Sequence, residues 1–163
     1  MASRRDGFTF IEFLVSITVL GIITVVGIGV INPVKQFEKA RDTERKSDLA
    51  QYRVALESFA SAHNSLYPGF TDDNNIAWEE LCVLLEADDH LSDCPEDPRS
   101  LLYLYRTNGL GTAVATATEY VLWVELEEEV DGNTIYWEVC SDGRTGQVAA
   151  TVDFTDAVCD VSL

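Results

Sequence analysis

The chain has 163 residues and a formal net charge of −17 at pH 7. Residues 1–63 carry 7 acidic and 8 basic side chains, whereas residues 64–163 carry 21 acidic side chains and only 3 arginines. So acidic a region argues against nucleic-acid binding, which requires clustered Lys and Arg, and favours solubility through like-charge repulsion. The length predicts one soluble domain together with an anchor.

The first predicted element is an apolar helix. Residues 8–31 follow a short leader that contains Arg4 and Arg5, and Glu12 is the single charged residue between positions 10 and 31. As a helix, those 22 residues would extend roughly 33 Å, enough to cross a bilayer core. The basic leader predicts a single-pass protein of the cytoplasmic membrane, with its N-terminus inside and its C-terminal domain exported.

Two features separate this segment from an ordinary secretory signal: the apolar run is too long, and no A-x-A-like cleavage site follows it. The simplest alternative is an uncleaved signal anchor. Glu12 is a separate observation, because a carboxylate at membrane depth is costly and usually marks a function or a partner. The alternative for Glu12 is a side chain that reaches back to the membrane interface.

The junction Gly7-Phe8-Thr9-Phe10-Ile11-Glu12, placed after a basic leader, resembles the type IV prepilin family. The resemblance is specific over about residues 4–33 and looser as far as residue 62. It implies that a prepilin peptidase cleaves after Gly7 and that Phe8 is then N-methylated. It also implies that Glu12 meets the amine of Phe8 in a neighbouring subunit during assembly.

The resemblance implies four segments along the chain. These are a leader peptide (1–7), a hydrophobic transmembrane and filament-core helix (8–33), an amphipathic helix of the head (34–62) and an acidic globular head (63–163). The family often has a proline near the position of Gly29, whereas this chain has Pro33. Local unwinding and simple close packing at the glycines of the run therefore both stay open.

Residues 34–62 predict an amphipathic helix. Apolar residues recur at spacings of three and four, a pattern formed by Phe37, Ala40, Leu49, Tyr52, Leu56, Phe59 and Ala60. The simplest expectation is one continuous helix over residues 8–62, whose second half packs on the head. The mixed charges of residues 35–48 are interpreted as a solvated face, with a subunit contact as the alternative.

The head is predicted to be small and mainly β. A turn is expected at residues 67–69 and a short helix at residues 78–85. Strands are expected at 101–107, 119–127 and 134–141, with a fourth at 147–152, because these runs are rich in aromatic and β-branched residues. Asn108-Gly109 and Asp131-Gly132 are hairpin-type turn signals. The predicted fold class is α+β, with an antiparallel meander laid on the long N-terminal helix.

All four cysteines follow the apolar run, which favours disulfides in an oxidising compartment. Three pairings are possible, and the prediction is Cys82–Cys94 with Cys140–Cys159. Both bonds close short loops, and each is expected to stabilise the folded state by roughly 3 kcal/mol in the chain-entropy model. Free thiols and a zinc site are the alternatives, and zinc is disfavoured because there is no CxxC motif and His63 and His90 lack ligand spacing.

No catalytic motif or cofactor is predicted. The C-terminal turns carry a group of acids, and some relatives among the pseudopilins bind Ca²⁺ in C-terminal loops, but the spacing does not match an EF-hand. A Ca²⁺ site is therefore only an alternative, at Asp142, Asp153, Asp156 and Asp160. The side chains of Trp78, Trp123 and Trp137 are expected to pack in the core rather than to form an aromatic binding surface.

The resemblance implies a structural subunit of a pilus or pseudopilus rather than an enzyme. Its implied partners are other subunits, a prepilin peptidase, an assembly platform with its ATPase, and membrane lipid before assembly. Its implied destination is an extracellular or envelope filament. Two other functions stay open: a monomeric, membrane-anchored binding domain with an acidic exported face, and, as a distant third, a membrane-tethered hydrolase.

Overall fold

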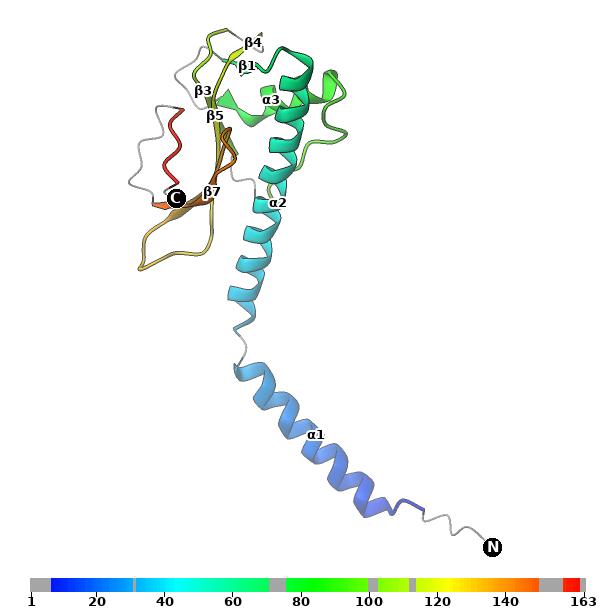
Figure 1. The fold of residues 1–163 in the computed structure, drawn as a ribbon. Coiled ribbons are helices and arrows are strands. Elements are labelled where there is room, and N and C mark those ends of the chain that lie inside the picture. The colour runs from blue at the N-terminus through cyan, green and yellow to red at the C-terminus, as the bar shows by residue number, and fades with distance from the viewer. Residues whose placement is uncertain are drawn as a thin grey trace, which may run out of the picture. The chain divides into compact units, whose positions relative to one another are not determined.

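A computed structural model describes residues 7–30, 32–70, 76–99, 103–111, 114–149 and 157–161. The chain divides into two compact units, residues 1–37 and residues 38–163. The helices of the described residues are α1 (Phe10–Val30), α2 (Pro33–Ala62) and α3 (Trp78–Ala87). The strands are β1 (Tyr67–Gly69), β2 (Ile76–Ala77), β3 (Leu104–Thr107), β4 (Val114–Ala117), β5 (Tyr120–Glu125), β6 (Ile135–Cys140) and β7 (Thr145–Ala149) (Figure 1). The fold class is α+β, as predicted.

The single helix predicted over residues 8–62 is instead two helical elements, with Asn32 outside both. Pro33 explains the start of α2, because proline has no N–H and disfavours helical geometry in the residue before it. The side chain of Asn32 then caps α2, with its Oδ1 3.5 Å from the Lys35 N–H. Among the described residues, none of the helices is both long and apolar enough to cross a membrane. The membrane-spanning role of residues 8–33 therefore stays a prediction.

The second helix packs one face into the head. Its buried apolar residues are Leu49, Tyr52, Ala55, Leu56, Phe59 and Ala60, which confirms the stripe predicted for its C-terminal half. Phe37 and Ala40, assigned to the same stripe from the sequence, are exposed. The helix stops where predicted, because Asn64 adopts a left-handed φ of 57° and the Ser65 N–H donates to the Ala60 carbonyl at 2.8 Å.

A five-stranded antiparallel sheet in the order β2-β3-β5-β6-β7 faces α2 and α3 (Figure 1). The predicted strands at 101–107, 119–127 and 134–141 correspond to β3, β5 and β6, and the predicted helix at 78–85 corresponds to α3. The fourth predicted strand begins two residues earlier, as β7, and its predicted residues 150–152 lie outside the described part of the chain. Within the sheet, Trp123 of β5 pairs with Leu104 of β3 on one side and with Glu138 of β6 on the other.

Two turn predictions differ in outcome. Asp131 and Gly132 both have positive φ, 53° and 75°, as a two-residue hairpin turn requires. Asn108-Gly109 does not form such a hairpin, because the next strand, β4, pairs with β1 rather than with β3. The predicted turn at residues 67–69 is strand β1, which accommodates Pro68 beside a register shift in a two-stranded ribbon.

The sheet is covered on both faces. The main core fills the space between α2, α3 and one face, and includes Tyr105, Tyr120 and Leu122. A smaller cluster on the other face contains Val121, Trp123 and Cys140, with Cys159 and Val161 of the C-terminal segment packed on it. Gly146 makes room for that segment, since a Cβ there would lie 2.8 Å from a methyl of Val161. Trp123 is therefore a core residue, as expected, and the Trp78 side chain lies outside the described residues.

Candidate functional site

The predicted cleavage junction lies immediately before α1. Residues 7–9 are non-helical, Gly7 has open space where a Cβ would lie, and the Phe8 side chain is 74% exposed. Thr9 is the N-cap of α1, since its Oγ1 lies 3.4 Å from the Glu12 N–H and its carbonyl accepts from the Phe13 N–H at 3.2 Å. The scissile bond proposed from the sequence is thus exposed and held outside helical geometry.

Glu12 occupies the third position of α1, where a carboxylate interacts favourably with the helix N-terminus. Thr9 and Glu12 have the spacing of a capping box. The Glu12 side chain is exposed, and no ion pair to it occurs among the described residues. The site is therefore an acidic group at the start of an apolar helix, open to a cation from another molecule.

The remainder of α1 presents apolar side chains to the outside. Every turn of α1 from Phe10 to Val25 carries large apolar side chains that are exposed, with exposed fractions between 38% and 79%. The hydroxyls of Ser16, Thr18 and Thr24 donate back to carbonyls within the same helix, at 2.7 to 3.0 Å. These polar groups are therefore satisfied inside the helix, and the surface that α1 offers to a partner is hydrophobic.

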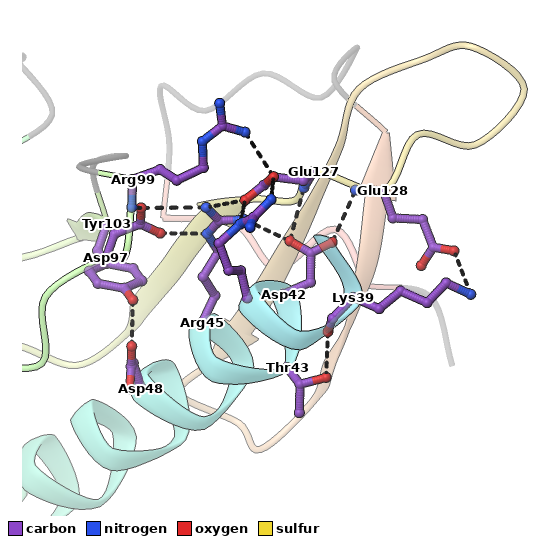
Figure 2. A network of polar contacts seen from close by, with 11 residues as sticks. Lys39, Asp42, Thr43, Arg45, Asp48, Asp97, Arg99, Tyr103, Glu127 and Glu128 are labelled. Atoms are coloured by element: carbon purple, nitrogen blue, oxygen red, sulfur yellow. Dashed lines mark hydrogen bonds and ion pairs between the residues drawn. The ribbon is translucent and has the colours of Figure 1, made fainter. Parts of the chain in front are cut away.

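A second polar site, which the sequence interpretation missed, lies on α2. The charged run over residues 35–48 was expected to be solvated, but Asp42, Arg45 and Asp48 are 3%, 0% and 6% exposed. Arg45 is the centre of this network (Figure 2). Its guanidinium pairs with Asp42 at 2.7 Å, with Glu127 at 2.9 Å and with Asp97. Burial is tolerated because every charge has a close, hydrogen-bonded partner.

The network joins α2 to two distant loops. The carboxylate of Asp42 accepts the backbone N–H groups of Glu127 and Glu128 at 2.9 and 3.0 Å (Figure 2). The Arg41 side chain also pairs with Glu127. Hydrogen bonds from Arg41, Arg99 and Arg45 lower the pKa of Glu127 to about 2. Together these bonds hold the loop after β5 against the helix.

Asp48 forms the edge of the same buried surface. Its Oδ2 accepts a 2.6 Å hydrogen bond from the Tyr103 hydroxyl, just before β3. Burial raises the pKa of Asp48, and the Tyr103 hydrogen bond opposes that change. The sequence does contain a signal for this site, because positions 42, 45, 49, 52 and 56 continue a single helical stripe. The site was missed because Asp42 and Arg45 are charged and were therefore assigned to the solvated face of the helix.

The four cysteines form the two predicted pairs. Cys82–Cys94 joins α3 to the loop before β3, with Cα atoms 5.9 Å apart, and Cys140–Cys159 joins β6 to the C-terminal segment at 5.8 Å. Among the described residues, the two groups close enough to suggest a three-donor metal site both contain these bonded cysteines, so their thiolates are not free ligands.

The acids named for Ca²⁺ are only partly described, and Asp153 and Asp156 lie outside the described residues. The carboxylate of Asp142 accepts the backbone N–H of Arg144 at 2.9 Å and pairs with the Arg144 side chain at 2.7 Å, and these contacts lower the pKa of Asp142. Asp160 enters the hydrogen-bond network through its backbone N–H, which donates to the buried carboxylate of Glu138 at 3.2 Å.

Comparison with known protein families gives a match at the first of these sites. Residues 2–28 match the model of the prokaryotic N-terminal methylation motif. The match covers Gly7, Phe8 and Glu12 and most of α1. No curated protein and no solved structure gives a significant match to the chain. Residues 2–28 therefore carry the signature of the type IV pilin and pseudopilin family.

Proposed function

We propose that this chain is a type IV pilin-like subunit, cleaved after Gly7 and polymerised through its N-terminal helix into a pilus or pseudopilus. The supporting observation is the apolar surface of α1, exposed from Phe10 to Val25 within the methylation motif. Large exposed apolar surfaces on proteins are sites of membrane or protein contact, since burying them contributes about 25 cal/mol per Å². Membrane lipid covers α1 before assembly, and neighbouring subunits cover it in the filament.

The start of α1 supplies the specificity of this polymerisation. After cleavage, Phe8 carries an α-amino group, and Glu12 of a neighbouring subunit provides the opposite charge. A pairing of these two groups favours one axial offset between adjacent helices, which apolar contacts alone do not define. The exposure of Gly7 and Phe8 suits the approach of a prepilin peptidase. An assembly platform with its ATPase would supply the work of extrusion.

Intact-mass analysis of the protein from its native membrane tests processing. The expected mass lacks residues 1–7 and carries one methyl group on Phe8. Protein from cells without the peptidase is the matched control and should retain the leader. A mature protein that still carries Met1 to Gly7 while the peptidase is active would refute the proposal.

Assembly is tested separately by Glu12→Gln, which keeps shape and hydrogen bonding but removes the charge. Cleavage and membrane retention should persist, and insertion should improve, because a charge at membrane depth costs about 2.5–3.5 kcal/mol. The yield of sheared filament per cleaved subunit should fall sharply. An unchanged yield would show that Glu12 does not set assembly. A wild-type protein that never appears in filaments would instead favour the monomeric, anchored binding domain.

A further inference from the structure

The only two histidines of the chain meet in the head. His63 follows the last residue of α2 and His90 follows the end of α3, and their ring centroids lie 6.4 Å apart with planes at 71°. Phe59 packs against both rings, stacked on His63 at 4.0 Å and edge-on to His90 at 5.6 Å. Because Phe59 is buried, it holds both imidazoles in place.

The hydrogen bonds of the two rings leave one nitrogen of each available. Nδ1 of His63 lies 2.9 Å from the Phe59 carbonyl, which can only accept, so Nδ1 carries the proton and Nε2 has the lone pair in the neutral ring. Nδ1 of His90 lies 2.9 Å from the Ser58 hydroxyl. Among the described residues, neither Nε2 makes a hydrogen bond.

A metal-binding histidine has one ring nitrogen fixed by a hydrogen bond, which leaves the other for the ion. His63 and His90 each have Nδ1 fixed in this way. Both imidazoles are half-buried, and His90 lines an open groove of about 440 Å³ beside α2, through which ions can reach it. Two imidazoles on one zinc ion, at about 2.0–2.1 Å each, place their centroids roughly 5–6 Å apart. The observed centroid separation of 6.4 Å is close to this range.

We propose that His63 and His90 bind one borderline divalent transition-metal ion, of the zinc class, through their Nε2 atoms and so link the end of α2 to the end of α3. Imidazole is a preferred ligand of zinc, nickel and copper. Within the described part of the chain, no three-donor group includes either histidine, so water completes the coordination. The strongly acidic surface of residues 64–163 raises the local concentration of cations around the site.

The test uses the full-length oxidised protein, stripped with chelator and titrated with ZnCl₂, with MgCl₂ as the ion control. Wild-type protein should bind one Zn²⁺ and show a higher Tm in zinc but not in magnesium. His63→Gln and His90→Gln keep a side-chain amide for the existing hydrogen bonds but lack the Nε2 lone pair. Each should weaken Zn²⁺ binding by at least about tenfold.

Glu129→Gln is the matched control, since it removes an exposed carboxylate from the acidic surface and should leave the zinc isotherm unchanged. Equal zinc binding by wild type and both histidine variants would overturn the proposal. So would a zinc effect lost in Glu129→Gln alone. Electron paramagnetic resonance of Cu²⁺ bound to the wild-type protein needs no variant: two nitrogen ligands support the site, and one or none refutes it.

Discussion

The consecutive helices α1 and α2 show opposite relations between polarity and exposure. On α1, apolar side chains such as Phe10, at 79%, are exposed, whereas on α2 the guanidinium of Arg45 is completely buried. Each arrangement is costly in water unless a partner is supplied. The partners of Arg45 belong to the same chain, Asp42, Asp97 and Glu127. We infer that those of α1 belong to other molecules.

Burial alone therefore does not identify the function of a charged or apolar residue. The buried charges of α2 hold two loops of the head against the helix, through Asp97 and Glu127. The exposed apolar residues of α1 add little to the stability of the head and are available for assembly. Substitutions in the two helices should therefore separate folding from polymerisation.

The largest effect on folding is expected from Arg45→Met. Methionine keeps much of the side-chain volume, but it leaves Asp42, Asp97 and Glu127 close together without their central cation. Removing one partner of a buried ion pair costs about 3–5 kcal/mol. All three tryptophans lie in residues 64–163, so denaturant unfolding followed by tryptophan fluorescence reports on the head.

Lys39→Met is the matched control for that substitution, because Lys39 pairs with Glu128 on the surface, with 58% of its side chain exposed. Its expected cost is below about 1 kcal/mol. Similar losses in the two variants would show that the buried network does not stabilise the head more than an ordinary surface pair.

A smaller, pH-dependent effect is expected from Glu127. Its folded-state pKa of about 2 lies below the ordinary value of 4.5, so the native state releases this proton more readily than the unfolded state. The resulting stabilisation is complete above the unfolded pKa and is lost as pH falls from about 4.5 to 2. Glu127→Gln should remove this part of the acid sensitivity of Tm, whereas Glu129→Gln should retain it. An unchanged profile for Glu127→Gln would contradict the assignment.

The smallest effect on head stability is expected from Ile17→Ala in α1, where Ile17 is 45% exposed. The free energy of unfolding of the head should change by less than about 0.5 kcal/mol, as for surface substitutions in general. Leu49→Ala, at a fully buried position of α2, should cost about 2–5 kcal/mol in the same assay. If Ile17→Ala destabilises the head as much as Leu49→Ala, α1 is part of the folded core and the contrast fails.

Local patterns in the sequence were enough to determine much of this protein. Some features depend only on residues that are close in the sequence. These are the motif around Gly7, Phe8 and Glu12, the apolar run of α1, the stripe from Leu49 to Phe59, and the strands β3, β5 and β6. The period of apolar positions and the identity of turn residues encode such features directly. The short-range cysteine pairs follow the same logic.

Only the tertiary structure decided the features that depend on contacts between distant residues. The burial of Arg45 requires Asp97 and Glu127, which come from two separate loops, and without them the same arginine would be solvated. β1 is a strand only because β4 returns beside it, although its residues read as a turn. His63 and His90 have no ligand spacing in the sequence, yet the ends of α2 and α3 bring their rings together. A residue's environment is set by the groups that surround it, and for these residues those groups lie far along the chain.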